Sequence, residues 1–226
     1  MGMIIQSAES YAKGTEFTFA YEKKSNSYFL RFYGLAYDDN DEDYINFSIY
    51  IKPRKFPLTT LKYLAYPDLV KMKYDFVVKK FTSKEPEEIF KFIFFMRLAV
   101  SNNVADISQI RKRLQIDLKN KIYVKFFNFG VISVENEKAA FMKIIDACRE
   151  SIKKYPTTLE HDEEVLKTNK MPDGSKLTYN QRNIFYMLKG EKEVIRQLQT
   201  FSETVVGLID NIQAAKDHKS FQVRFL

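Results

Sequence analysis

The stretch "YINFSIYIK", Tyr44–Lys52, alternates apolar and polar side chains from one residue to the next. Its three isoleucines and Phe47 share one face of an extended chain, and Asn46 and Ser48 share the other face with the tyrosines. A period of two predicts a β-strand with one face buried in a core. Pro53 follows directly and is expected to end the strand, because proline lacks a backbone N–H donor.

Further strands are predicted on both sides of this one. The segments "TEFTFAY" (15–21) and "YFLRFYGLAY" (28–37) flank a polar turn and predict a β-hairpin. The segment "KYDFVVKKF" (73–81) predicts a fourth strand. The segment "KIYVKFFNFGVISV" (121–134) predicts a fifth strand, in which Gly130 marks a bulge or a kink.

Helical patterns fill much of the remaining chain. Ser83 and an acidic first turn predict a helix that continues through "IFKFIFFMRLAV" (89–100), and its nearly continuous apolar character predicts burial. From residue 135 an apolar stripe predicts another helix, with Phe141, Ile144, Ile145, Cys148 and Ile152 on one face. Residues 157–178 are predicted to be a polar connection. A last helix is expected from about 179 to about 215, and "SFQVRFL" (220–226) predicts a short strand.

The last helix carries a second pattern. Its apolar residues alternate by four and three, which is heptad spacing: Val194, Leu198, Phe201, Val205, Leu208 and Ile212. Packing of this stripe against the helix at 136–154 of the same chain is the default expectation. The alternative is that these six residues form an interaction surface, for self-association or for docking into a larger assembly.

These elements predict an α+β fold. A mostly antiparallel N-terminal sheet with packed helices occupies 1–134, and a C-terminal helical hairpin occupies 135–226, either as two parts or as one continuous domain. The two parts differ in charge, with 21 Lys and Arg against 15 Asp and Glu in the first and 15 against 14 in the second. The single cysteine excludes an internal disulfide, and the N-terminus lacks the pattern of a signal peptide, so an intracellular, cytoplasmic protein without a membrane anchor is expected.

Patterns of catalytic and metal-binding residues are incomplete. The acidic loop 38–43 begins like a calcium loop but has Tyr44 where the sharp turn needs glycine. Two histidines and one cysteine give no zinc spacing, and the glycines are too scattered for a phosphate loop. Asp117 and Lys119 would fit a divergent nuclease, but their partner carboxylates are not found. The sequence therefore predicts a non-enzymatic protein without metal or cofactor.

Basic residues beside aromatic rings give the functional hypothesis. Cations neutralise phosphates, and flat rings stack on unpaired bases for roughly 1–3 kcal/mol each. The formal net charge of +7 and two basic clusters, at 52–80 and 111–125, favour such a surface. Predicted nucleic-acid-binding residues are Tyr44, Tyr50, Lys52, Arg54, Lys55, Arg111, Arg113, Lys121, Tyr123 and Lys125.

The sequence thus predicts a protein that binds single-stranded nucleic acid, from a phage or mobile element. The alternative hypothesis is an interaction or assembly subunit, such as a virion component or an inhibitor of a host complex, with an acidic or nucleic-acid-containing partner or a second copy of itself. That alternative depends on the heptad stripe and on the absence of a catalytic set.

Overall fold

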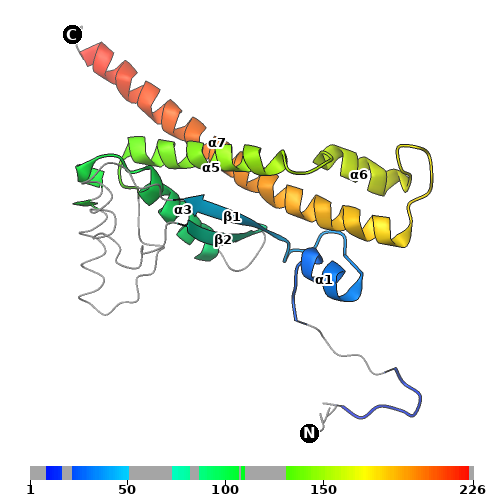
Figure 1. Ribbon diagram of the computed structural model, residues 1–226. Helices are drawn as coiled ribbons and strands as arrows, with labels where there is room; N and C mark the ends of the chain where they lie inside the picture. The colour runs from blue at the N-terminus through cyan, green and yellow to red at the C-terminus, as the bar shows by residue number, and fades with distance from the viewer. Residues whose placement is uncertain are drawn as a thin grey trace.

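The computed structural model describes residues 9–16, 22–50, 73–81, 87–106, 108–109 and 131–223. Within these ranges the side chains of residues 50, 73, 74, 87, 88 and 214–223 are not described. The elements, in chain order, are α1 (Asn26–Tyr33), β1 (Tyr44–Tyr50), β2 (Lys73–Lys79), α3 (Glu87–Val100), α5 (Val134–Ile152), α6 (Leu159–Thr168) and α7 (Tyr179–Val223) (Figure 1). The fold is α+β, as predicted.

The strands β1 and β2 form an antiparallel pair. The register runs from Tyr44 opposite Lys79 to Tyr50 opposite Lys73, so the predicted strands at 44–52 and 73–81 are confirmed within the described residues. Phe47 and Ile49 of β1 and Val78 of β2 are buried, which places the apolar face of the alternating pattern in the core.

Helices α3, α5 and α7 complete the core around this sheet. On α3, Phe92, Phe94 and Leu98 are fully buried, as the apolar run 89–100 predicted. The predicted stripe of α5 packs inward, and Ile144 and Cys148 are inaccessible to solvent. The start of α7 lies along α6, its middle lies along α5, and its C-terminal part extends beyond the other elements (Figure 1). Within the described residues, no helix combines the length and hydropathy that crossing a bilayer requires.

The predicted strand at 28–37 is wrong, because residues 26–33 form α1. Two capping signals outweigh the aromatic β-propensity. The side chain of Ser25 accepts a hydrogen bond from the backbone N–H of Tyr28, which caps the N-terminus. Gly34 adopts the left-handed conformation (φ 67°) that ends many helices, and its N–H donates to the carbonyl of Leu30.

The polar connection predicted at 157–178, the end predicted for the last helix and the strand predicted at 220–226 also differ from the structure. The polar connection at 157–178 contains α6, which Thr158 caps by accepting from the N–H of His161, and which buries Leu159 and Val165 despite its polar composition. The helix α7 continues to Val223, through part of the predicted strand 220–226, because neither glycine nor proline follows Gly207.

The prediction of a fifth strand at 121–134 is wrong at its C-terminal end. Ser133 caps α5 with extended backbone, and Val134 is already helical. Residues 121–130 of that prediction, and residues 17–21 of the strand predicted at 15–21, lie outside the described residues.

Candidate functional site

An open groove separates β1 from α5. The two elements run in opposite directions on its sides (Figure 1), and α3 and α7 contact both of them. One half of the groove, of about 510 Å³, lies between α1, the start of β1 and the end of α5. The other half, of about 640 Å³, lies between the end of β1, α3 and the middle of α5. Because Glu150 lines the second half and Ser151 the first, the halves adjoin along α5.

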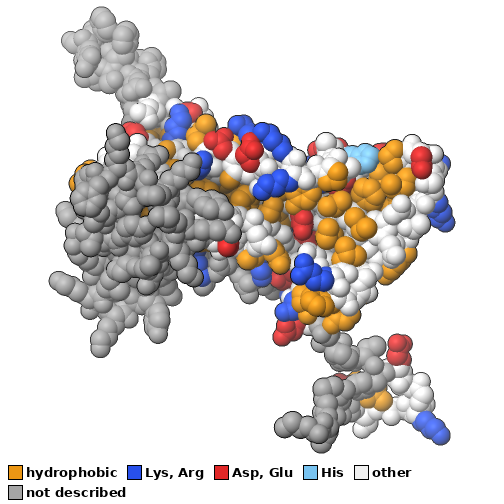
Figure 2. All heavy atoms as spheres, viewed as in Figure 1, with side chains coloured by type: hydrophobic (Ala, Val, Ile, Leu, Met, Phe, Trp, Pro, Cys, Tyr) orange, Lys and Arg blue, Asp and Glu red, His pale blue; other side chains and the backbone are white. Residues whose placement is uncertain are grey.

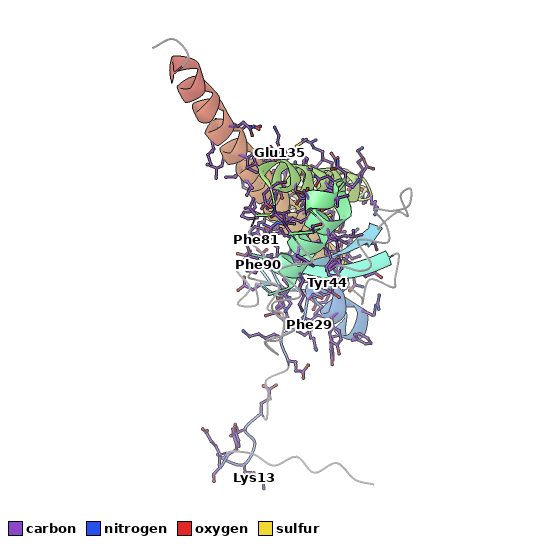
Figure 3. All side chains as sticks on the ribbon, turned by 90° about the vertical axis from the view of Figure 1, so that its left-hand side faces the viewer. Lys13, Phe29, Tyr44, Phe81, Phe90 and Glu135 are labelled. Atoms are coloured by element: carbon purple, nitrogen blue, oxygen red, sulfur yellow. The ribbon has the colours of Figure 1, made fainter. Side chains whose placement is uncertain are left out.

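The first half has an aromatic entrance. Tyr28 and Phe32 of α1 line it, with ring centroids 4.6 Å apart, and Phe32 is 60% exposed. Tyr44 at the start of β1 lies between α1, marked by Phe29, and α5, marked by Glu135 (Figure 3). Hydrophobic side chains gather between α5 and α1 on this face of the molecule (Figure 2). Such exposed rings are more typical of a binding surface than of a structural one.

A partly buried hydrogen bond forms the inner wall of this half. The hydroxyl of Tyr155 donates to Oε2 of Glu191, at 2.7 Å. Burial raises the pKa of Glu191, and this effect outweighs the opposing effects of the Tyr155 hydrogen bond and the Lys192 charge. Burial also raises the pKa of Tyr155, so its hydroxyl keeps its proton and remains a donor. The hydrogen bond from Tyr155 thus holds the Glu191 side chain in place at one end of the groove.

The second half has an apolar floor and a charged rim. Met96 and Val100 of α3 and Ala147 of α5 line it, and Ser48 and Ile49 form its β1 side. On the α5 side the lining side chains follow one another as Lys143, Asp146 and Glu150, all exposed, and Lys154 continues this row in the first half. Helical spacing places the first three of these groups along one face of α5, and Lys154 lies just past its C-terminal end.

A polar network around Asn26 lies at the start of β1, on the side opposite the groove. The backbone N–H and side-chain amide of Asn26 both donate to the Asp43 carboxylate, at 2.6 and 2.9 Å. The Asn26 side chain also exchanges hydrogen bonds with the backbone of Tyr37. Asp43 lies directly against α7 at Gly190, where an added Cβ would be 1.9 Å from Oδ2. The close packing at this crossing therefore favours glycine, because any side chain would displace the Asp43 carboxylate.

A second buried polar cluster connects α6 to α7. Lys192 and Asp162 are fully buried and form an ion pair. The Lys192 ammonium also donates to the hydroxyl of Thr157, which in turn donates to Asp162 at 2.6 Å. The same ammonium lies 5.4 Å from the centre of the Tyr155 ring, on the wall of the groove.

Most predicted nucleic-acid-binding residues lie outside the described residues or have undescribed side chains. Tyr44 lies in the groove, and Tyr50 ends β1 with its side chain not described. The others are not described: Lys52, Arg54, Lys55, Arg111, Arg113, Lys121, Tyr123 and Lys125. At the end of the first basic cluster, Lys79 pairs with Glu42 and the buried Lys80 pairs with Glu193, at 3.1 and 2.8 Å. These two charges already have carboxylate partners.

The heptad stripe divides along α7. Val194 and Leu198 are fully buried, and Val205 packs against the same core. Phe201 contacts the rings of Phe81 and Phe141. Leu208 and Ile212 are each 57% exposed. The packing of the first part within the chain is thus observed, and the interaction surface at the other end stays a prediction.

Cysteine and acidic clusters do not form a separate site. Cys148 is a free, fully buried thiol, and burial raises its pKa to about 12, so it is a core residue as the apolar stripe indicated. The loop at 38–43 is less solvated than expected, since Asp43 is buried. Among the described residues, no group of three metal-binding side chains converges.

The fold matches solved structures of SET-domain methyltransferases. "Crystal structure of the SET domain of LSMT bound to MeLysine and AdoHcy" matches with a TM-score of 0.59 and 18% identity, covering 84% of this chain and 40% of that chain. "Structure of Rubisco LSMT bound to AdoMet" matches with a TM-score of 0.60 and 18% identity, covering 83% and 40%. The structure of the LSMT SET domain with lysine and AdoHcy matches with a TM-score of 0.60 and 19% identity, covering 83% of this chain and 38% of that chain. This chain therefore spans about 40% of those proteins. No curated protein matches it.

A family model identifies the chain more specifically. The model "Rubisco LSMT substrate-binding" matches residues 69–195, more than half of the sequence. The chain belongs to this family. The matched range includes β2, α3, α5, α6 and the first part of α7.

These findings overturn the functional prediction from sequence. The prediction of a non-enzymatic, single-strand-binding protein of phage origin is wrong, and so is the prediction that its partner is nucleic acid. The reason is that the family and the matched structures belong to a protein lysine methyltransferase. The assembly-subunit alternative is wrong for the same reason. Sequence reasoning also missed the groove residues on α1 and α5, although the capping residues Ser25 and Gly34 could have located α1.

Proposed function

We propose that this chain is the part of an AdoMet-dependent protein lysine methyltransferase that binds the protein substrate. The groove between β1 and α5 holds the substrate segment. The observation that carries the proposal is that β2, α3, α5 and the groove-lining part of α7 lie within a range matched by a substrate-binding family.

The shape of the groove supports a peptide rather than a compact small molecule. Both halves are open to solvent and follow the length of β1, which has seven residues. At about 3.3 Å per residue, such a strand spans roughly 20 Å. The apolar floor and the charged rim offer both hydrophobic anchoring and polar selection, which peptide-binding grooves combine.

We assign no AdoMet site to the described residues. Glu191 and Tyr155, the partly buried polar pair of the groove, bind each other. Among the described side chains, one buried polar atom lacks a partner, Oδ1 of Asn136, and the amide nitrogen of that residue binds Arg97 and Ser101 at the α3–α5 junction. AdoMet supplies the methyl group in such enzymes, and the groove residues of this chain bind and orient the protein that receives it.

A matched pair of variants tests the groove. Ala147→Arg places a large cation on the groove floor, and Met142→Arg makes the same change at an exposed position of α5 that does not line the groove. Binding of the full chain to an array of lysine-centred nine-residue peptides is measured for both. We expect Ala147→Arg to weaken binding at least about tenfold, which corresponds to about 1.4 kcal/mol, and Met142→Arg to change it by less than about twofold.

Two results would contradict the proposal. One is the absence of binding to any lysine-centred peptide. The other is an equal loss of binding in both variants, which would indicate that the peptides do not contact the groove. Circular dichroism of each variant provides the control for folding.

A further inference from the structure

Within the described residues, the backbone of β1 pairs with a strand on one edge only. The backbone N–H of Lys80 donates to the carbonyl of Asp43, so these opposed residues form a hydrogen-bonded pair. In an antiparallel ladder such pairs alternate with pairs that do not bond directly. The N–H and C=O groups of Ile45, Phe47 and Ile49 therefore face β2, and those of Tyr44, Asn46 and Ser48 point away from it.

The outward-pointing groups face the groove. Tyr44 and Asn46 line its first half and Ser48 its second. Among the described residues β1 pairs with β2 alone, and Asn46 and Ser48 are exposed. An edge with free donors and acceptors is a template for one more strand. Here α5 borders the groove on the other side, so an added strand would lie between the helix and β1.

We infer that the substrate segment binds as an added strand on the free edge of β1. This inference rests on the proposed function and specifies how the same groove works. Backbone hydrogen bonds to Tyr44, Asn46 and Ser48 supply affinity without regard to sequence. Alternate side chains of the segment then point to the floor formed by Met96 and Val100, and the others point toward the rim.

The charges on the rim select the segment. Along the rim the order is Lys143, Asp146 and Glu150 on α5, followed by Lys154 two residues past its end, so an acidic centre is bordered by two cations. The two carboxylates also pair with the exposed side chains of Arg149 and Lys153, at 4.0 and 2.7 Å, and such exposed pairs are weak enough to exchange for a substrate cation. At 1.5 Å per residue Lys143 and Glu150 lie about 10 Å apart along the helix, and Lys154 follows two residues after the helix ends. In an extended chain the residues two before and two after a central position lie about 13 Å apart. The complementary segment therefore has a central lysine, an acidic residue two positions to each side, and apolar residues between them.

The test uses the full chain and the acetylated, amidated peptide Thr-Val-Glu-Val-Lys-Val-Glu-Val-Thr. Amide hydrogen exchange is followed by NMR with and without peptide. We expect exchange at Asn46 and Ser48 to slow at least about tenfold at saturation, because their N–H groups become bonded. The N–H groups of Ile45 and Phe47 already bond to β2 and serve as internal controls.

Two series of peptide variants complete the experiment. N-methylation at alternate amides removes donors from one edge of the peptide at a time, so one set is expected to lose at least about tenfold in affinity and the other set much less. Reversal of the charge pattern, with glutamate at the centre and lysines beside it, is expected to weaken binding several-fold at low salt.

The outcomes separate the two proposals. Binding that leaves Asn46 and Ser48 unprotected, with both N-methyl sets equally tolerated, overturns strand addition and leaves the groove as the substrate site. Tighter binding of the charge-reversed peptide overturns the assigned selectivity. If neither this peptide nor any lysine-centred array peptide binds, both proposals fail.

Discussion

The two sides of β1 differ in the exposure of their polar groups, which are buried on one side and exposed on the other. At its start, Asp43 is buried against Gly190 of α7 and accepts two hydrogen bonds from Asn26. Toward α5, by contrast, Asn46 and Ser48 are exposed along an open groove. The closed side holds the strand at a fixed position, and the open side leaves its backbone available. This contrast suggests that stability and binding can be altered separately in this protein.

The largest effect is expected from breaking the buried ion pair between α6 and α7. Lys192→Met would leave the carboxylate of Asp162 buried without its cation, which typically costs roughly 3–5 kcal/mol. Urea unfolding of the full chain, followed by circular dichroism, measures the loss. The double variant Lys192→Met, Asp162→Leu should recover much of it, because no uncompensated charge remains. A loss as small as that of an exposed pair would contradict the importance of this pair.

A smaller loss is expected at the crossing of α7 with Asp43. Gly190→Ala places a methyl group against the carboxylate, and such overpacking costs about 1–3 kcal/mol. Gly207→Ala is the matched control on the same helix, because nothing lies within 4 Å of its added Cβ. It should stabilise the chain by up to about 1 kcal/mol through helix propensity. Equal effects of the two changes would show that Asp43 does not press on α7.

The Asp43 carboxyl also predicts a pH dependence. Burial raises its pKa to about 6 from the usual 3.8, although Asn26 and Lys80 oppose the shift. Between these pH values the folded chain binds a proton that the unfolded chain has released. Stability from this group is therefore present below about pH 4 and is lost as pH rises to 6. Urea unfolding across this range should show a loss of about 1–3 kcal/mol in the native chain relative to Asp43→Asn. If the native chain and the Asp43→Asn variant showed the same dependence of stability on pH, this prediction would be contradicted.

The smallest effect on stability is expected in the groove. Ala147 is half-buried at the floor and borders open space, so Ala147→Arg should change the free energy of unfolding by less than about 0.5 kcal/mol. The same variant is expected to weaken peptide binding at least about tenfold. A large loss of stability instead would mean that the groove wall belongs to the closed, structural side of the molecule.

The sequence predicted those elements whose periodicity is strong. The alternation at 44–52 and the helical stripe around Ile144 both place the buried face correctly. It failed at α1, where four aromatic residues suggested a strand although Ser25 and Gly34 cap a helix. It also failed at α6, which packs on α7 through buried apolar residues and an ion pair of Asp162 with Lys192 that local composition cannot show.

The functional site was less accessible to sequence reasoning. Tyr44 was singled out for its aromatic ring and does line the groove. The other wall comes from α5, about a hundred residues further along the chain, and only the packing of both elements on α3 and α7 brings the two walls together. Charge counts favoured nucleic acid, because they do not reveal that Lys79 and Lys80 are neutralised by Glu42 and Glu193.

The attachment of α1 has a consequence for the order of folding. The side-chain amide of Asn183 donates to the carbonyl of Gly34 across 149 residues of sequence, and Asp43 meets Gly190 over a similar separation. Contacts that close such long loops have a large entropic cost and tend to form late. The aromatic entrance of the groove, which α1 provides, should therefore be among the last parts of the protein to form and among the first to open.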